Sequence, residues 1–316
     1  MKICYLIQTH KNPEQIYRLI KVIKQSSTHS HILIIHNPVN SKLEPKIFQD
    51  FSDVNVLNNS HHIRLGDFSL TQSYLSAINW LFENKIKFDW LINLSGQDYP
   101  TQPIVQIEEF LAQTNYEGFM QYFDVLSSKN PWRLKQGYER YFYQYSRSQG
   151  YLLNWQKIML KPLKDLVNYT QDKIKIETSY SMMIGIKNNY NPFEKNLVCY
   201  GGSFFMTLSR KCVEFLYKYY KNIKYIELVD YYKKTFMPDE SFIQTVLVNS
   251  NLLKLSNNNH RYIDYSNSRY GHPRILTCAD YPLLTNDKIH FARKFDITQD
   301  SQILDMLDTR IFSILV

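Results

Sequence analysis

Cysteine, glycine and proline are all scarce in this chain, and each scarcity argues against a class of protein. Its 316 residues include only 4 cysteines, which are far apart and form no C-x-x-C, so neither a disulfide scaffold nor a thiolate zinc site is indicated. With 9 glycines, 11 prolines and no low-complexity run, the chain has the composition of an ordinary globular protein that can bury a large core.

Long apolar runs are also missing. The run at the start, Ile3 to Ile7, ends at Gln8 and has the length of a buried strand rather than of a signal peptide or a membrane span. No other run approaches the roughly 18 residues that a membrane-spanning helix requires. Together with the isolated thiols, this pattern predicts a cytoplasmic protein, with peripheral contact to the inner face of a membrane left open.

Paired carboxylates are a further absence. No two of the 29 acidic residues stand two positions apart, so the chain contains no D-x-D, and its 9 histidines do not combine with Cys or Glu at metal-ligand spacing. An enzyme that moves a group off a diphosphate must neutralise the leaving phosphates, and without a metal site fixed Arg and Lys side chains are the other means. The signatures G-x-x-x-x-G-K-[ST], G-x-G-x-x-G and G-x-S-x-G are absent too. The sequence therefore predicts no bound metal and no cofactor.

What the chain does have is an excess of positive charge. The formal net charge of +8 indicates an anionic partner, for which a nucleotide diphosphate, a membrane surface and a nucleic acid all qualify. The lysines are spread along the chain without a block of five or six like charges, which disfavours a nucleic-acid partner. A nucleic-acid-binding protein stays as an alternative that a binding assay at varied salt would test.

The first 120 residues alternate between strand and helix patterns. Strands are predicted at 2–8, 31–36, 54–57 and 89–94, and helices at 13–25 and 69–84, the second opening with a capping box from Ser69 to Gln72. Apolar strands separated by helices indicate a parallel sheet that is covered on both faces, and such sheets bind ligands at the carboxyl ends of their strands.

The remainder divides into an insertion and a second half. Residues 125–198 are rich in Tyr, Arg and Lys and include a basic amphipathic stretch at 155–167, which predicts a helical lid or a surface-docking element, with an ordinary helical excursion as the alternative. Beyond it we expect a strand at 204–208, helices from Ser209, at 239–249 and near 300–311, and strands near 261–264 and 289–292. The chain is thus predicted to be one α/β domain over 1–316, with a nucleotide-binding half at 1–120, an insertion or lid at 125–198 and an acceptor- and diphosphate-binding half at 199–316.

Glu240 is the candidate catalytic base. It follows Pro238, and in the first turn of a helix the macrodipole would favour its ionised form. A carboxylate there can accept the proton of a hydroxyl as that oxygen attacks. The alternative is that Asp239 and Glu240 only mark a helix start, as acidic residues often do.

Cations that follow Glu240 in the chain are candidates for a diphosphate clamp. Arg274 can grip two phosphate oxygens, and Lys294, next to Arg293, offers a point charge within an apolar segment. Surface solubility is the alternative for both. Asp98 follows an apolar strand but lacks the partner that a divalent cation would need, so it is expected either to orient a sugar or to cap the turn before Pro100.

Eight short segments together resemble the core-2/I-branching glycosyltransferase family, and within it the branch of peptide O-xylosyltransferases. They occur in the order of the family and cover nearly the whole chain: I-Q-T-H-K at 7–11, G-D-F-S-L at 66–70, I-N-L-S-G-Q-D-Y-P at 92–100, L-K-Q-G at 134–137, G-G-S-F-F-M-T-L-S-R at 201–210, M-P-D-E-S-F-I-Q-T-V-L-V-N-S at 237–250, R-Y-I-D-Y at 261–265 and F-A-R-K-F-D at 291–296.

The resemblance implies a GT-A-like, Rossmann-type fold, a UDP-sugar donor, inversion at the anomeric carbon and catalysis without a required metal. It places the catalytic carboxylate on Glu240 and the partners of donor and acceptor on thirteen further residues. These are Gln8, His10, Asn37, Arg64, Arg274, Arg293 and Lys294 for the nucleotide and its diphosphate, and Asp98, Ser203, Phe204, Phe205, Asp264 and Tyr265 for the donor sugar and acceptor.

The chain departs from its branch in three places near the expected donor. It has Asn37 where the family often has an Asp, Phe204-Phe205 where the xylosyltransferases read D-W, and Leu65-Gly66-Asp67 where they read W-G-G. These departures leave the sugar open between N-acetylglucosamine and xylose, and the acceptor open among glycans, lipid-linked glycans and peptides. They also motivate the alternative of a catalytically inactive protein that binds a glycan or a nucleotide.

Overall fold

A seven-stranded, mostly parallel sheet forms the centre of the computed structural model, which describes residues 1–58, 63–133, 135–188, 190–194, 197–266 and 272–313. Leu134, the first residue of one of the eight segments, lies outside these ranges. The strand order is β13-β6-β12-β4-β1-β2-β3, and β12 alone runs antiparallel to the neighbours with which it pairs, β4 and β6. The four predicted N-terminal strands are confirmed as β1 (Ile3–Thr9), β2 (His31–His36), β3 (Val54–Asn58) and β4 (Trp90–Ser95).

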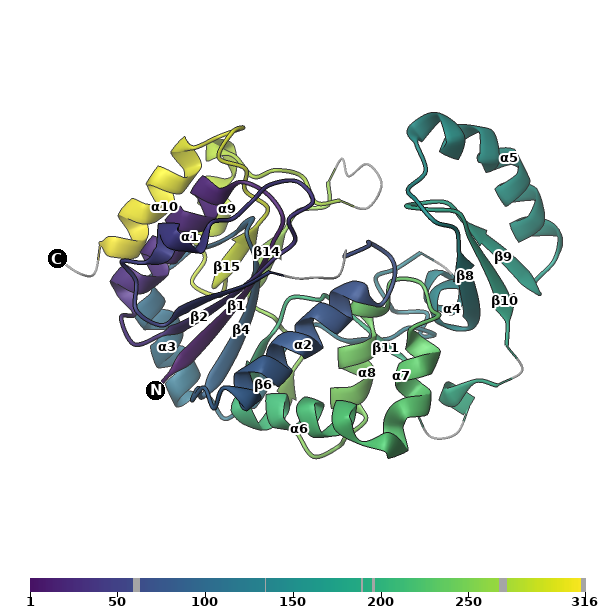
Figure 1. The fold of residues 1–316 in the computed structure, drawn as a ribbon, viewed down its shortest axis with the longest axis horizontal. Coiled ribbons are helices and arrows are strands. Elements are labelled where there is room, and N and C mark those ends of the chain that lie inside the picture. The colour runs from purple at the N-terminus through teal and green to yellow at the C-terminus, as the bar shows by residue number, and fades with distance from the viewer. Residues whose placement is uncertain (59–62, 134, 189, 195–196, 267–271, 314–316) are drawn as a thin grey trace.

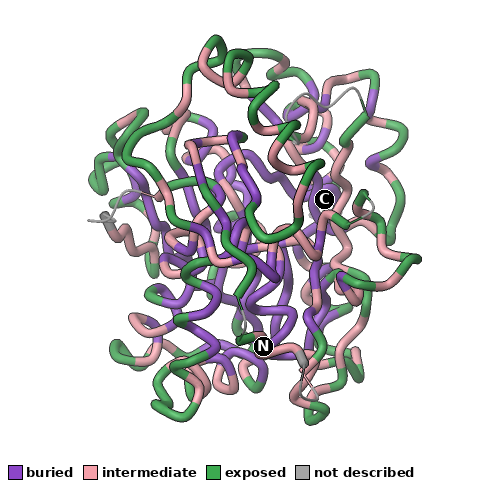
Figure 2. The backbone as a smooth tube through the Cα atoms, turned by 90° about the vertical axis from the view of Figure 1, so that its right-hand side faces the viewer, coloured by how far each residue is buried: buried purple, intermediate pink, exposed green. Residues whose placement is uncertain are grey.

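Side chains alternate across the sheet and divide the core into two layers. On β1, Ile3, Tyr5 and Ile7 pack toward one face, whereas Cys4 and Leu6 pack toward the other. All five are fully buried, as expected for a strand that is covered on both faces. Figure 2 shows this interior as a block of buried backbone surrounded by exposed loops.

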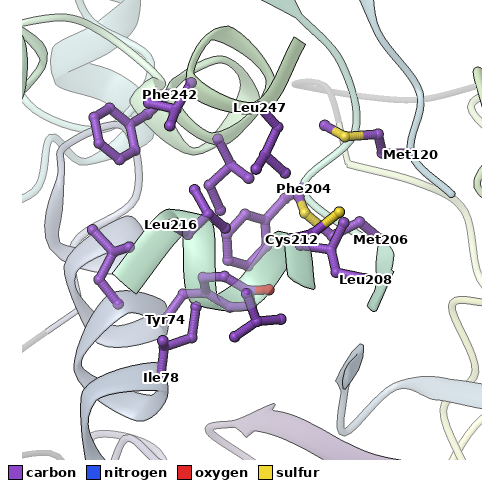
Figure 3. Packing of buried hydrophobic residues seen from close by; sticks show 14 of the residues in the cluster. Tyr74, Ile78, Met120, Phe204, Met206, Leu208, Cys212, Leu216, Phe242 and Leu247 are labelled. Atoms are coloured by element: carbon purple, nitrogen blue, oxygen red, sulfur yellow. The ribbon is translucent and has the colours of Figure 1, made fainter. Parts of the chain in front are cut away.

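Helices cover both layers (Figure 1). The first layer packs against α1 (Pro13–Ser26), α3 (Ile104–Gln113), α9 (Tyr281–Leu284) and α10 (Gln302–Phe312). The second packs against α2 (Ser69–Glu83), α6 (Arg210–Lys221), α7 (Ile226–Tyr232) and α8 (Phe242–Val248). In Figure 3, Tyr74 and Ile78 of α2 lie near Leu216 of α6 and Phe204, which shows how this layer is filled.

Three short strands from later in the chain complete the sheet. These are β6 (Gly118–Phe119), β12 (Thr207–Ser209) and β13 (Leu255–Ser256). A smaller sheet joins β5 (Asp98–Pro100) to β15 (Phe291–Arg293) and β14 (Arg261–Ile263), and β7 (Phe123–Asp124) pairs with β11 (Tyr200–Gly201). Residues from both halves of the chain therefore share one sheet, and β15 brings Arg293 beside Asp98.

The insertion contains more strand than the sequence predicts. Its elements are α4 (Gln136–Tyr141), β8 (Tyr143–Arg147), α5 (Asn154–Thr170), β9 (Ile174–Glu177) and β10 (Met183–Lys187). The strands form an antiparallel sheet of order β8-β10-β9, so the insertion is mixed rather than helical. Figure 1 shows α5 and this sheet at the edge of the molecule, away from the central sheet.

Local geometry also differs from the sequence prediction at two helix starts. Ser69 does not cap α2, because its hydroxyl accepts a hydrogen bond from the Arg64 backbone N–H at 2.7 Å instead. The helix predicted at 239–249 is divided into a 3-10 turn, Pro238–Glu240, and α8, with Ser241 between them. Glu240 therefore precedes the helix, and the dipole of α8 does not act on it as a first-turn residue.

Gly202 fixes the approach of that 3-10 turn to the core. Its N–H donates a hydrogen bond to the Glu240 carbonyl oxygen at 2.8 Å. A Cβ at this position would lie 1.9 Å from the backbone oxygen of Gln121, where no side chain can move aside to relieve the clash. Only glycine permits this close contact between two backbone segments.

We expect Gly202→Ala to destabilise the protein by about 1–3 kcal/mol, because the added methyl group must displace backbone. Gly118→Ala is the matched control, since its Cβ would meet first the flexible end of Leu255, at 2.8 Å. Denaturant unfolding of the two variants measures the difference. Equal loss in both would contradict the assigned role of Gly202.

Candidate active site

A cavity of about 780 Å³ opens at the carboxyl ends of β1, β2 and β4, within the size range of small-molecule sites. Its wall combines these strand ends with the loop before α2, the insertion and the segment around Glu240. Residues that line it are Gln8, Thr9, His10, Asn37, Val39, Asn40, Ile63, Arg64, Leu65, Leu70, Ser95, Arg147, Gly150, Tyr151, Tyr180, Ser203, Phe204, Phe205, Met237, Asp239, Glu240, Tyr265, His272, Pro273 and Arg293.

Two buried amide side chains stand at the ends of β1 and β2. Gln8 and Asn37 both line the cavity, and the side-chain oxygen of each is buried without a hydrogen-bond partner in the protein. Buried polar atoms are normally satisfied, so such orphaned acceptors at a cavity wall suit a ligand that brings N–H or O–H donors. Beside them, Thr9 is hydrogen-bonded to His36 at 2.8 Å, which fixes the strand ends relative to each other.

Arg293 is held rigidly at the cavity wall. Its Nε lies 3.0 Å from Oδ1 of Asp98, and its guanidinium carbon lies 3.9 Å from the centre of the Phe205 ring. Asp98 is 1% exposed and is not part of the cavity wall, which differs from its expected contact with a sugar. Its observed contacts are structural: it pairs with Arg293 and accepts a hydrogen bond from the Ser95 N–H. Charge and ring together preorganise the guanidinium.

Positive charge accumulates beside Arg293. Burial lowers the pKa of Lys294, and repulsion from Lys11 and Arg293 lowers it further. Burial likewise lowers the pKa of His10, with Lys11 and then His36, Lys294 and Arg293 adding to the shift. Lys11 is paired with Asp296 at 2.7 Å, and Arg293 with Asp98 at 3.0 Å. Groups whose charged forms disfavour one another mark an edge suited to an anion.

Glu240 lies at the same cavity, bound to an arginine from the insertion. Arg140 of α4 donates a hydrogen bond from Nη1 to Oε2 of Glu240, and its guanidinium carbon lies 4.4 Å from the centre of the Trp132 ring. Burial opposes the charge of Arg140, but Glu240 and Tyr141 outweigh it and raise the arginine pKa. The Glu240 side chain keeps 28% exposure, so its carboxylate stays accessible from the cavity.

Asp239 is the other carboxylate at the wall. Burial raises its pKa to about 7, and repulsion from Glu240 adds to the shift. Tyr180 lies nearby, and burial followed by the charges of Asp239 and Glu240 raises its pKa to about 12. The cavity thus combines the carboxylates of residues 239–240 with a basic edge formed by Arg293 and its neighbours.

Ten of the fourteen residues expected at the site line this cavity: Gln8, His10, Asn37, Arg64, Ser203, Phe204, Phe205, Glu240, Tyr265 and Arg293. The structure does not bring Asp98, Asp264, Arg274 or Lys294 to its wall. Arg274 is held instead between two carboxylates, Asp264 at 2.6 Å and Asp280 at 2.5 Å, so its charge is already neutralised.

Sequence reasoning missed three residues that the fold adds to the site. Arg140, Arg147 and Tyr180 all come from the insertion, and Arg147 is paired with Asp67 at 2.9 Å. Arg140 and Arg147 lie in the segment W-R-L-K-Q-G-Y-E-R-Y-F-Y-Q-Y-S-R, whose density of Arg and Tyr was the available signal, whereas Tyr180 lies outside it. Within the described ranges, no three His, Cys, Asp or Glu side chains gather in a way that could hold a metal ion.

Comparison with known proteins points to one family. A family model described as Core-2/I-Branching enzyme matches residues 3–290. Xylosyltransferase 2 of Rattus norvegicus is 24% identical, over 99% of this chain and 34% of that protein. Beta-glucuronosyltransferase GlcAT14B of Arabidopsis thaliana is 23% identical, over 84% of this chain and 54% of that protein. The chain therefore spans about a third to a half of the length of these curated relatives.

The raised pKa of Asp239 predicts a pH-dependent cost in stability. This carboxyl binds its proton more tightly in the folded than in the unfolded chain, so ionising it above its ordinary pKa of 3.8 destabilises the fold until about pH 7. Asp239→Asn should therefore gain stability over the wild type as pH rises through this window, by roughly 2–4 kcal/mol at its upper end. Urea unfolding of both proteins at several pH values measures this stability difference. A stability difference that stays constant with pH would contradict the assignment.

Proposed function

This chain belongs to the core-2/I-branching enzyme family, and on that premise we propose that it is an inverting glycosyltransferase. In this proposal the enzyme moves a sugar from a UDP-sugar to a hydroxyl of a glycan or glycoconjugate, without requiring a metal. The observation that carries the proposal is that a carboxylate, Glu240, and a fixed cation, Arg293, line the same cavity. The mixed α/β fold with its mostly parallel sheet is consistent with a GT-A-like architecture.

The donor is proposed to lie along the strand ends. Gln8 and Asn37, the latter standing where the family often has an Asp, offer buried, unpaired acceptors for the N–H of a base such as uracil. His10 and Arg64 would flank the nucleotide, and the diphosphate would lie against the basic edge. An anion there would offset the mutual repulsion of Arg293, Lys294 and Lys11. This repulsion in the unliganded protein therefore favours anion binding at the basic edge.

The proposed sugar transfer uses Glu240 as the base and Arg293 as the cation for the leaving group. The acceptor oxygen attacks the anomeric carbon as its proton passes to the Glu240 carboxylate. The bond from that carbon to the diphosphate oxygen breaks, and its electron pair leaves with UDP. The growing negative charge is then stabilised by Arg293, a preorganised cation. One base opposite the leaving group is enough for a single displacement with inversion, whereas a glycosidase would use two facing carboxylates.

The proposal that no metal is required rests on the burial of Asp98 and on the cations near the cavity. Asp98 follows an apolar strand and is the carboxylate that would be expected to bind a divalent metal. It is buried against Arg293 instead and does not reach the cavity. The guanidinium thus stands where a carboxylate-bound divalent ion would otherwise neutralise phosphate. Lys294 and Arg274 stay in the proposal as outer cations of the diphosphate clamp, the latter only if phosphate displaces Asp264 or Asp280.

The donor sugar is proposed to be N-acetylglucosamine or xylose, with the sugar near Ser203, Phe204, Phe205 and Tyr265. The names of the relatives add glucuronic acid to the sugars that a test must include. For the acceptor we propose a glycan, a lipid-linked glycan or a peptide. We further propose a cytoplasmic location with peripheral contact to the inner face of a membrane, where a lipid-linked acceptor would be presented.

The alternative is a protein of the same fold that binds a nucleotide or glycan without turnover. Arg140 favours it to the extent that it occupies one oxygen of Glu240. The remaining exposure of that side chain favours catalysis. Release of UDP from a panel of UDP-sugars, with and without a chelator, separates the two without knowledge of the acceptor. Turnover that a chelator abolishes and manganese restores would refute the metal-independent proposal.

We expect Glu240→Gln to lower UDP release by about 100- to 10,000-fold, the usual range for loss of a general base. The amide can still accept the hydrogen bond from Arg140, so UDP affinity should stay close to that of the wild type. Turnover assays and calorimetric titration with UDP measure the two effects. Near-normal turnover would move the base to Asp239, the other carboxylate on the cavity wall.

Arg293→Ala should weaken UDP binding by at least about tenfold, since a charge-assisted contact contributes roughly 1.5–3 kcal/mol. Uridine, which has no phosphate, should bind both proteins alike, and Arg293→Lys should recover part of the loss. Arg274→Ala should change UDP affinity less, because Asp264 and Asp280 already neutralise that arginine. Unchanged UDP affinity in Arg293→Ala would contradict the clamp, and a larger loss in Arg274→Ala would place the clamp there.

A further inference from the structure

The inward side of helix α5 is mixed: Leu160 and Val167 are half-buried there, and most of the contacts that hold it are polar. Asn168 bonds to both backbone groups of Ile176 on β9, with N–H···O distances of 2.8 and 3.0 Å. Lys164 pairs with Glu177 at 3.1 Å, and Lys157 donates to the carbonyl oxygen of Ser179 at 2.6 Å. A helix on a globular protein ordinarily packs through its apolar stripe. Here hydrogen bonds and an ion pair hold the helix, and its most exposed apolar residues take no part in packing it.

The opposite side of α5 is an apolar stripe that faces outward. None of the 17 residues of the helix is buried. Ile158 is 72% exposed, Met159 70% and Tyr169 92%. The spacing of the exposed apolar residues places them on one helical face, and we call this set the α5 stripe: Trp155, Ile158, Met159, Leu163, Leu166 and Tyr169. Figure 2, seen from the side where α5 lies, shows no buried tube in this helix.

We propose that the α5 stripe inserts into the surface of a membrane that contains anionic lipids. A helix with Trp and Leu on one face and Lys on the other has the pattern of helices that lie in the bilayer interface. Trp155 and Tyr169 stand near the two ends of the stripe, and such amphipathic rings favour the headgroup level. The helix lies along the surface, because no helix in the described part of the chain is long and apolar enough to cross a bilayer.

Charge around the helix favours an anionic surface over a neutral one. Residues 151–187, which include α5, β9 and β10, contain six lysines against three acidic residues. Lys161, beside the stripe, is 72% exposed, and its only charged partner among the described contacts is Asp165, one turn along the helix. Basic groups next to an inserted face are attracted to the negative potential of anionic leaflets.

A second copy of the chain fits the α5 stripe less well than a membrane does. The helix is about 26 Å long and presents six large side chains, whereas a stable interface takes roughly 20–30 residues and about 800 Å² from each partner. A membrane needs no such matching surface, because burial in the interface scales with the apolar area offered. The same insertion lines the cavity through Arg147, Tyr151 and Tyr180, so docking would bring the cavity close to the bilayer.

Flotation with vesicles tests the proposal, independently of any enzymatic activity. Wild type, Ile158→Glu/Leu166→Glu and Ile223→Glu/Leu252→Glu are compared on phosphatidylcholine vesicles with and without phosphatidylserine, at low salt. The control pair adds the same charge at exposed apolar residues outside α5. We expect the wild type and the control to float with the anionic vesicles, and the stripe variant to bind at least about tenfold more weakly. Thermal melting and UDP release without vesicles should be alike in all three.

Fluorescence separates insertion from adhesion by charge alone. Lipids brominated on their acyl chains should quench part of the tryptophan emission of the wild type, and Trp155→Phe should remove that quenching while keeping flotation. No flotation of the wild type, equal flotation of the stripe variant and the control, or quenching unchanged in Trp155→Phe would each overturn the proposal. A dimer that the stripe variant abolishes, in a wild type that ignores vesicles, would also overturn it and assign the stripe to a second copy.

Discussion

The ion pair between Arg140 and Glu240 connects the two parts of the molecule that make the cavity. Glu240 lies in a 3-10 turn of the core, held by the Gly202 N–H, whereas Arg140 belongs to the first helix of the insertion. Two neighbouring hydrogen bonds connect the same two parts. The Tyr141 hydroxyl donates to the Met237 carbonyl at 2.9 Å, and the Phe236 N–H donates to the Arg140 carbonyl at 3.0 Å. The insertion is thereby anchored at the carboxylate on which the proposed chemistry depends, so the position of the base and that of the cavity wall are set together.

A second constraint is the presence of both kinds of charge at one cavity. Asp239 and Glu240 line it together with Arg293, which Asp98 and Phe205 hold in place and whose charge acts on Lys294. Charges fixed in advance need no reorganisation during reaction, which is how a protein stabilises a departing diphosphate without a metal. Burial is the main reason why the pKa of Asp239 is raised and why those of Lys294 and His10 are lowered, and nearby groups of like charge add to each shift.

Sequence alone predicted the parts that follow from local pattern. The four N-terminal strands and the two helices between them were predicted because their apolar periodicity is long and regular. Nine of the ten predicted residues at the cavity lie at strand ends or in short segments that resemble the family, and the fold gathers them with Arg64, which lies in neither. Arg140, the burial of Asp98 and the two aspartates around Arg274 depend on contacts between distant segments, which spacing does not encode. The basic stretch at 155–167 was recognised as amphipathic, but its periodicity could not show that the apolar side faces outward.

A structure of the protein with UDP tests the central claim most directly, because the claim is that the diphosphate contacts the Arg293 guanidinium. The account predicts uracil against Gln8 and Asn37 at the ends of β1 and β2, and the diphosphate in contact with the Arg293 guanidinium. The outer phosphate should face the space in front of Glu240, where a sugar would be attached, and the Arg293–Asp98 pair should stay intact. A diphosphate bound away from Arg293, or bridged to Asp98 by a metal ion, would contradict the account.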